Sequence, residues 1–253
     1  MELEPLHIAL GLGIGLLTGF INTLAGGGSL LTLPFLIFLG LEAPVANGTN
    51  RIGIFFQTLV GGIVLRRKTK MSLSGSGIYL IPAITAAIVG ALLAVKIDDE
   101  QMKIIIGVVM AFMLIPILMN RDKWLATESR PSARNRRPLL VVVFLALGFY
   151  GGFIQAGIGV FLISALVLIA NYTLTHANVL KNLIIAAYTL PAIVVFLVND
   201  QVHWPFGILL MSGQVTGSWV AAKFAGESKH APKVIRWLLI IMVAAGAVKM
   251  FIG

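Results

Sequence analysis

The chain has 253 residues, of which 58% are hydrophobic and only 11% are charged, and its formal net charge is +9. A soluble domain of this length needs more surface charge, so the composition indicates an integral membrane protein with little mass outside the bilayer. The absence of cysteine excludes disulfides, thiolate metal sites and thiol chemistry. Most cations lie in short segments beside apolar runs, a positive-inside pattern that argues against nucleic-acid binding.

The first apolar stretch, about residues 6–40, is too long for one untilted crossing of a bilayer. Gly26-Gly27-Gly28 interrupts it, and three consecutive glycines disfavour a continuous helix. We therefore predict a helix over 6–24 and a shorter one over 29–39, with Ser29 as the N-cap of the second. Further helices are predicted over 45–65, 77–95 and 102–119.

A second set of helices follows the basic segment 121–137 and has the same order. Gly157 and Gly159 interrupt its first apolar stretch as the triple glycine interrupts the first set. Its predicted helices cover 138–156, 160–169, 177–198, 206–224 and 234–252.

The two sets are related by a repeat with a fixed offset of 131 positions. Leu24-Ala25-Gly26-Gly27-Gly28 returns as Gln155-Ala156-Gly157-Ile158-Gly159, and Ala46-Asn47 returns as Ala177-Asn178. Small residues spaced four apart lie along one helix face and let two helices approach closely. Such a stripe is found at Pro82, Ala86, Gly90 and Ala94, and again at Gly213, Gly217, Ala221 and Ala225. We predict two membrane repeats, 1–120 and 138–253, joined by a basic cytoplasmic linker.

Loop charge predicts the orientation, because short basic loops stay in the cytoplasm. Placing 66–70 and 121–137 inside puts the acidic segment 98–100 and both chain termini outside. If each break is an in-and-out hairpin, each half crosses an odd number of times and the second half is inverted. A single kinked crossing at each break would leave the halves parallel. We prefer an all-α integral membrane protein of two inverted-topology repeats, each with a broken helix or re-entrant hairpin plus three spans, giving 8–10 membrane segments.

Two cations, Arg51 and Lys181, lie within apolar sequence. A charge in the hydrocarbon region costs several kcal/mol, so it usually faces a polar cavity. All ten carboxylates lie in predicted loops or near the termini. The two cations therefore suit an anionic substrate. The alternative is that both side chains snorkel to the membrane surface.

The broken helices are a second feature that favours an anion. A helix that begins inside the membrane exposes backbone N–H groups, backed by the positive end of the helix dipole. Glycines let an anion approach this main chain, although glycines also serve helix packing. The predicted substrate-binding residues are Arg51, Lys181, Gly26, Gly27, Gly28, Asn47, Asn50, Gly157, Gly159, Asn178, Asn182, Asn22, Gln155 and Thr49. Gln57 and Gln214 are interpreted instead as helix–helix hydrogen bonds.

Residues 19–34, Gly-Phe-Ile-Asn-Thr-Leu-Ala-Gly-Gly-Gly-Ser-Leu-Leu-Thr-Leu-Pro, resemble the glycine-rich signature of the sulfite exporter TauE/SafE family, also called the toluene-sulfonate uptake permease superfamily. The segment 46–50, Ala-Asn-Gly-Thr-Asn, resembles the element that follows in that family. The stretch 151–159 is a weaker copy without the triple glycine, and Ala165 replaces the proline. The resemblance covers essentially the whole chain. It implies transport of sulfite, thiosulfate or organosulfonates across the bacterial cytoplasmic membrane.

The leading interpretation is a secondary transporter of a small sulfur-containing anion that works by alternating access, without a cofactor or bound metal. An anion channel with the same cation-lined site is the alternative. An intramembrane enzyme is disfavoured, because four scattered histidines and no cysteine offer no nucleophile–base pair or metal cluster. The expected partners are the anion and the lipid bilayer, with no nucleic acid. A second copy of the chain and a coupling proton or sodium ion are left open.

Overall fold

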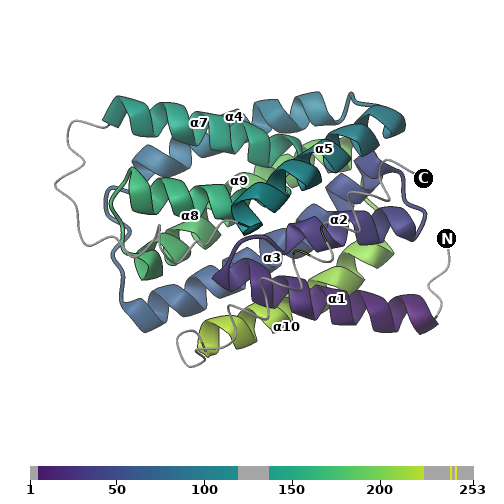
Figure 1. Ribbon diagram of the computed structural model, residues 1–253, viewed down its shortest axis with the longest axis horizontal. Coiled ribbons are helices and arrows are strands. Elements are labelled where there is room, and N and C mark those ends of the chain that lie inside the picture. The colour runs from purple at the N-terminus through teal and green to yellow at the C-terminus, as the bar shows by residue number, and fades with distance from the viewer. Residues whose placement is uncertain (1–4, 119–136, 225–239, 241–242, 244–253) are drawn as a thin grey trace.

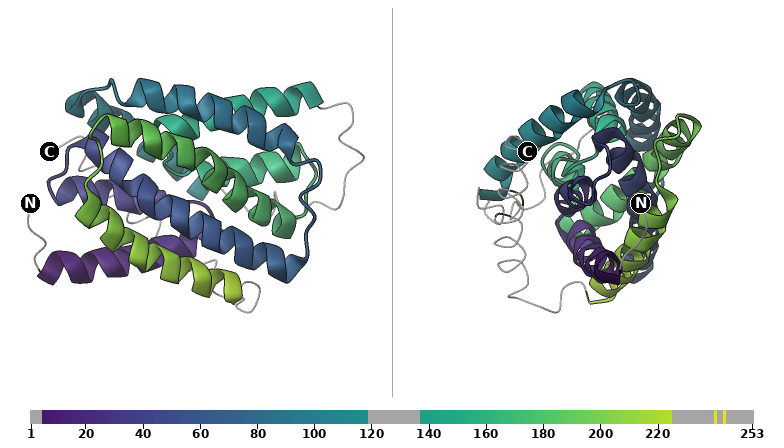
Figure 2. Two further views of the ribbon diagram at one scale, coloured as in Figure 1. Left: turned by 180° about the vertical axis from the view of Figure 1, so that it is seen from behind. Right: turned by 90° about the vertical axis from the view of Figure 1, so that its right-hand side faces the viewer.

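The computed structural model describes residues 5–118, 137–224, 240 and 243, and the regular elements in this part of the chain are all α-helices. They form a bundle elongated along one axis (Figures 1 and 2). The helices are α1 (Pro5–Leu24), α2 (Ser29–Phe38), α3 (Ala43–Thr69), α4 (Gly77–Ala94), α5 (Asp99–Leu118), α7 (Arg137–Phe153), α8 (Ile158–Leu168), α9 (Leu174–Val198) and α10 (Trp204–Lys223). Apart from residues 240 and 243, the predicted helix over 234–252 lies outside the described residues, as does all of the linker 121–137 but Arg137.

Both predicted helix breaks are present, one between α1 and α2 and the other between α7 and α8. Gly26 (φ +86°) and Gly157 (φ +68°) occupy equivalent positions of the repeat and both adopt left-handed backbone. Only glycine adopts this conformation without strain, which explains why the repeat keeps it there. The N-cap prediction was wrong: Gly28 is the N-cap of α2, and Ser29 is its first helical residue.

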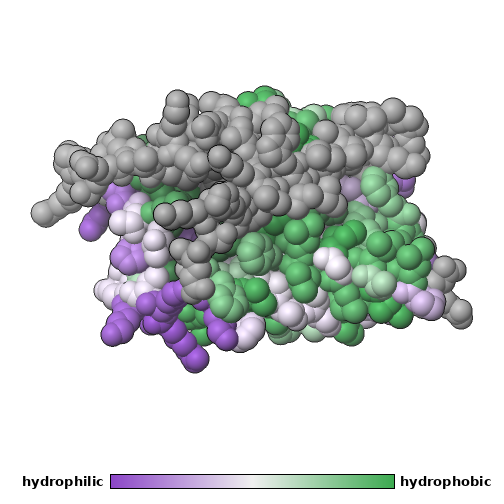
Figure 3. Space-filling view, turned by 60° about the horizontal axis from the view of Figure 1, so that its bottom comes forward, coloured by the Kyte–Doolittle hydropathy of each residue, from purple (hydrophilic) through white to green (hydrophobic). Residues whose placement is uncertain are grey.

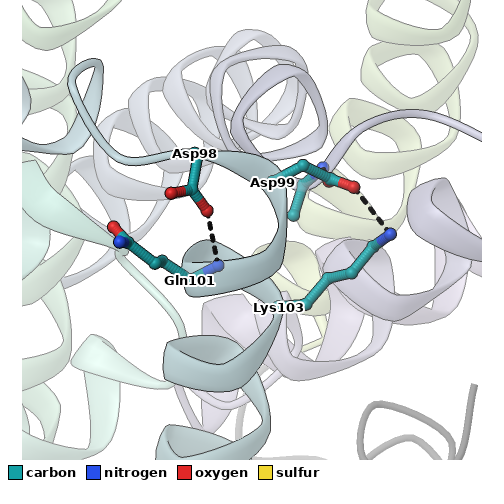
Figure 4. Close-up of polar contacts among 5 residues, drawn as sticks. Asp98, Asp99, Gln101 and Lys103 are labelled. Atoms are coloured by element: carbon teal, nitrogen blue, oxygen red, sulfur yellow. Dashed lines mark hydrogen bonds and ion pairs between the residues drawn. The ribbon is translucent and has the colours of Figure 1, made fainter.

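The helix ends differ from the predicted ones by up to four residues. At uncharged positions, α7 ends at Phe153 rather than at 156, and α9 begins at Leu174 rather than at 177. The other differences of this size lie at charged residues. α3 continues past 65, so Arg66, Arg67 and Lys68 lie in its last turn, where cations oppose the negative end of the helix dipole. α5 begins at Asp99 rather than at 102. Two local contacts support this start, shown in Figure 4: Asp98 Oδ1 accepts from Gln101 N at 2.8 Å, and Lys103 pairs with Asp99 at 2.7 Å.

The two halves are intertwined rather than packed as separate bundles. α1 packs along α10, and α7 packs along α4, so the first helix of each half lies against a helix of the other half. Glycines bring these backbones together. A Cβ on Gly217 would lie 2.0 Å from the carbonyl oxygen of Leu16, and a Cβ on Gly152 would lie 2.0 Å from that of Ala87. Larger residues at these positions would push the paired helices apart.

The small-residue stripes are largely confirmed. Gly90, Ala94, Gly213, Gly217 and Ala221 are buried on packed faces. Pro82 and Ala86 are half-buried at the edge of the face, because Ala83 and Ala87 point at α7 instead. Ala225 lies outside the described residues.

The described surface is that expected of a membrane protein. Three helices, α1, α4 and α9, are long and apolar enough to cross a bilayer. Figure 3 shows a broad hydrophobic face, with hydrophilic residues gathered at its left end. At that end α3 and α10 finish, and their exposed cations Arg66, Arg67, Lys68 and Lys223 form what we call the basic end.

The opposite end holds the acidic segment 98–100 and the connection between α9 and α10. Gln201 Nε2 donates to Val95 O at 3.0 Å, which ties that connection to the end of α4. In Figure 1, α1 starts at the right end of the molecule and α7 starts at the left. The first helices of the two halves therefore run in opposite directions along the bundle.

Candidate functional site

The two helix breaks meet inside the molecule. A Cβ on Gly26 would lie 2.5 Å from the carbonyl carbon of Gly159, and a Cβ on Gly159 would lie 2.5 Å from Gly26 Cα. Ser29 bridges the breaks, because its hydroxyl donates to Gln155 O at 3.3 Å and accepts from Gly157 N at 3.0 Å. The amino-terminal ends of α2 and α8, from different halves, are thus brought together.

A small pocket lies at this meeting point. Its polar lining comes from Asn22, Ser29, Thr58 and Gln155, its glycines are Gly26 and Gly159, and Ile54, Ile158 and Ile185 complete it. The pocket has space for about one water molecule, so the structure describes a closed form. The close backbone approach of Gly26 and Gly159 forms part of the pocket's wall.

Asn22 covers the start of α2. Its Oδ1 accepts from Gly28 N at 2.7 Å and from Ser29 N at 3.3 Å. These N–H groups lie at the start of α2, where the sequence analysis predicts that an anion binds. The carboxamide oxygen therefore occupies the place that an anion's oxygen would take at this helix start.

Lys181 of α9 holds the end of α1. Its Nζ is fully buried and donates to Asn22 O at 2.6 Å and to Thr23 O at 3.0 Å. A cation at a helix carboxyl terminus opposes the partial negative charge of that end. A residue of the second half thereby stabilises the broken helix of the first half.

Arg51 of α3, a residue of the first half, stabilises the end of α7 in the second half in the same way. Its guanidinium donates to Gly151 O at 3.0 Å, Gly152 O at 2.7 Å and Phe153 O at 3.3 Å, and lies 4.5 Å from the ring centroid of Phe196. Asn47 assists, because its Oδ1 accepts from Arg51 at 3.3 Å and its Nδ2 donates to Phe153 O at 2.8 Å.

Both cations lie behind the pocket rather than in its wall. Arg51 and Lys181 are 0% exposed, which excludes the alternative that they snorkel to the membrane surface. Lys181 reaches the pocket through the backbone of Asn22, and Arg51 reaches it through Gln155 Oε1 at 3.2 Å. Gln155 is itself fixed by a 2.8 Å hydrogen bond from its Nε2 to Thr189 Oγ1.

The carboxylates of the described residues lie at helix ends, and none is buried: Glu42, Asp98, Asp99, Glu100 and Asp200. The formal charge buried in the described part is therefore positive. Within it no group of three or more histidine, aspartate or glutamate side chains could hold a metal ion.

The structure separates the predicted site residues into two groups. Asn22, Gly26, Gln155 and Gly159 line the pocket. The others do not: Gly27, Gly28 and Gly157 form the breaks, and Arg51, Lys181 and Asn47 hold helix ends. Thr49 accepts from His203 N at 2.8 Å, Asn50 Oδ1 accepts from Thr32 Oγ1 at 2.7 Å, and Asn182 Nδ2 donates to Asn178 O at 2.8 Å.

Sequence reasoning missed Ser29 and Thr58 as pocket residues. Ser29 directly follows the triple glycine, so it had to lie at the first break. Thr58 lies seven positions after Arg51, which places both on one face of a helix. The interpretation of Gln57 and Gln214 as helix–helix hydrogen bonds was wrong, because neither carboxamide has a partner among the described residues.

Comparison with known proteins gives a family. The model of the Sulfite exporter TauE/SafE family matches residues 11–250. The chain is 25% identical over 256 positions to "Probable membrane transporter protein YfcA" of Escherichia coli K12, covering 98% of this chain and 90% of that protein. It is 27% identical over 237 positions to a "Probable membrane transporter protein" of Haemophilus influenzae, covering 90% and 88%. No solved structure matches the chain.

Proposed function

The chain belongs to the sulfite exporter TauE/SafE family of membrane transporters, and we propose that it is a secondary transporter of a small sulfur-containing oxyanion. Sulfite, thiosulfate or an organosulfonate is the proposed substrate class. The observation that carries the proposal is the pocket in which the starts of α2 and α8 meet, with two buried cations behind it.

The pocket offers donors suited to the oxygens of an anion. Gly28 N and Ser29 N already bind a carboxamide oxygen of Asn22, and a substrate oxygen can replace it. The hydroxyls of Ser29 and Thr58 line the pocket but already donate to Gln155 O and Ile54 O, so they serve a substrate only after these hydrogen bonds are exchanged.

Charge balance favours the anion as well. Each helix carboxyl terminus carries roughly half a negative charge, so the full charges of Arg51 and Lys181 exceed those of the helix ends they hold. The interior around the pocket is left positive. An anion entering the pocket neutralises this excess in a medium that screens charge poorly.

We propose that the two halves, 1–120 and 138–253, are inverted repeats with 8–10 membrane segments in all, joined by the cytoplasmic linker 121–137. The opposite directions of α1 and α7 support this arrangement (Figure 1). Sulfite is larger than the single water molecule for which the pocket has space, so the contact between Gly26 and Gly159 must open to admit it. Opening toward one side of the membrane at a time is alternating access.

The proposed location is the bacterial cytoplasmic membrane. The basic end would face the cytoplasm, and the acidic segment 98–100 with both termini would face outward. Accessibility of a cysteine introduced at Lys70 or at Glu100 to an impermeant maleimide in whole cells tests this orientation.

A thermal-shift panel on the purified protein tests the function. Ligands that bind only the folded form raise the melting temperature with concentration. We expect sulfite, thiosulfate or sulfoacetate to do so, and acetate, phosphate and chloride at equal ionic strength to do so much less. A positive ligand should then enter proteoliposomes that contain the protein. A panel with no selective shift, together with no uptake, would count against the proposal.

A further inference from the structure

Two glutamines, one of them next in sequence to the pocket residue Thr58, are fully buried without hydrogen-bond partners among the described residues. Gln57 of α3 and Gln214 of α10 are 0% exposed, and both the oxygen and the nitrogen of each carboxamide lack a partner among the described residues. Buried polar side chains are nearly always hydrogen-bonded in native proteins, since leaving them unpaired is costly. Four such atoms on two helices that pack together point to a group that binds between them.

The two carboxamides share one helix interface. A Cβ on Gly53 would lie 2.4 Å from Gln214 Oε1, so the Gln214 side chain rests directly on α3 at that glycine. Gln57 follows Gly53 by one turn on the same face, and helical side chains lean toward the preceding turn. The Gln57 side chain therefore leans toward the position that the Gln214 carboxamide occupies.

Polar contacts connect this interface to the pocket. Ser218, one turn after Gln214, donates to Gln57 O at 2.6 Å and accepts from Thr23 Oγ1 at 2.7 Å. Thr23 adjoins the pocket residue Asn22, and Gln57 adjoins the pocket residue Thr58. On both α1 and α3, therefore, a pocket residue is directly followed or preceded by a residue of the polar contacts around Gln57 and Gln214.

The equivalent interface of the other half holds one tyrosine and two alanines, and the buried Tyr188 hydroxyl also lacks a hydrogen-bond partner among the described residues. Shifted by 131 positions, Gln57 corresponds to Tyr188, while Gln214 and Ser218 correspond to Ala83 and Ala87. Tyr188, Ala83 and Ala87 are all buried between α4, α7 and α9. Since the same packing is achieved there with alanines in place of Gln214 and Ser218, the helix arrangement does not require the polar side chains of those two residues.

We propose that Gln57 and Gln214 form a second binding station, which holds the transported oxyanion at the depth of the pocket residues Ile54 and Thr58. The inference rests on the proposed function. The charge buried in the described part is positive, which disfavours a cation, while carboxamide N–H groups donate to oxyanion oxygens.

The test replaces each glutamine by methionine, which has a similar length but no hydrogen-bonding amide. Gln57→Met and Gln214→Met should each raise the melting temperature by about 2–4 °C, because an unpaired buried amide is removed. Each should slow uptake of the panel's positive oxyanion into proteoliposomes at least tenfold. The affinity of the pocket from thermal shift should stay within twofold. The control is Ser212→Ala, an exposed residue of α10 that bonds only to its own helix and should change none of these values.

Three other outcomes would contradict the proposal that the glutamines bind the oxyanion in transit. A lower melting temperature would mean that the amides are paired and structural. A higher one with normal uptake would mean that they bind only water, and a large loss of equilibrium affinity would make them part of the pocket. If the unsubstituted protein binds and transports no oxyanion, the proposed function fails first, and that result is separate from the behaviour of these variants.

Discussion

The two helix breaks have the same left-handed backbone conformation at Gly26 and Gly157, but different side chains hold them in place. At the first, Lys181 donates to two carbonyls of α1, and the Asn22 side chain covers the start of α2. At the second, Arg51 donates to three carbonyls of α7, Asn47 adds a fourth contact, and Ser29 of the other half binds Gly157 N. The start of the helix after the first break is thus covered by a side chain that a ligand can displace, whereas the Ser29 hydroxyl covers the Gly157 N–H group at the second.

This difference suggests separate roles for the two cations. Arg51 is mainly a positioning residue for α7, because its donors are spread over a helix end and two side chains. Lys181 touches the backbone of a pocket residue and supplies charge where the substrate is proposed to bind. The following predictions challenge this distinction, beginning with the largest expected effect.

Arg51→Gln should cost about 3 kcal/mol of stability, because several buried carbonyls lose their donor. The measurement is thermal unfolding in detergent, compared with Arg67→Gln at the exposed end of α3. Arg51→Lys should recover only part of the loss, since an ammonium cannot span the same carbonyls. A variant as stable as the parent would show that Arg51 does not fix α7.

Gly26→Ala should cost about 2–3 kcal/mol, and Gly159→Ala about 1–2 kcal/mol. Both substitutions would place a Cβ 2.5 Å from backbone of the opposite break, but only Gly26 also has a positive φ. Both variants should lose most transport, because the closed form cannot be reached. Equal stability losses would mean that the left-handed conformation of Gly26 contributes little.

Lys181→Gln should cost about 1–2 kcal/mol, because the carbonyls of Asn22 and Thr23 lose the donor that holds the end of α1. Its effect on ligand should be greater: oxyanion affinity should fall at least tenfold in thermal-shift titrations. Arg51→Gln, where enough folded protein is obtained, should lose less affinity. The reverse ranking of affinities would assign the electrostatic role to Arg51.

Asn22→Ala should have the smallest effect on stability, about 1 kcal/mol, as for loss of a helix cap. It should also tighten oxyanion binding by up to about tenfold, because the ligand no longer competes with the carboxamide for Gly28 N and Ser29 N. Weaker binding in this variant would mean that Asn22 is itself a substrate ligand.

Much of the fold was predictable because its signals are local. Glycine clusters interrupt helices because of their own backbone preference. The offset of 131 positions predicted equivalent breaks in the two halves, and Gly26 and Gly157 indeed both have a positive φ. The helix ends were less predictable at 66–69 and 99–101, where charged side chains cap and extend helices that hydrophobicity alone would end earlier.

The site was only partly predictable. The amides of Gln57 and Gln214 looked like ordinary helix–helix bonds, and only the register of α3 against α10 shows that they are unpaired. Ser29 and Thr58 could be placed in the pocket only when both breaks were seen together.

By itself the sequence determined where the helices break and that two cations lie within apolar sequence, since backbone preference and hydrophobicity act within a few neighbouring residues. The tertiary structure alone decided that each cation holds the broken helix of the other half. The partners of Arg51 lie about a hundred positions away, and those of Lys181 about a hundred and sixty. Such pairings depend on how helices cross, because a side chain reaches only the carbonyls that packing brings within about 3 Å of it.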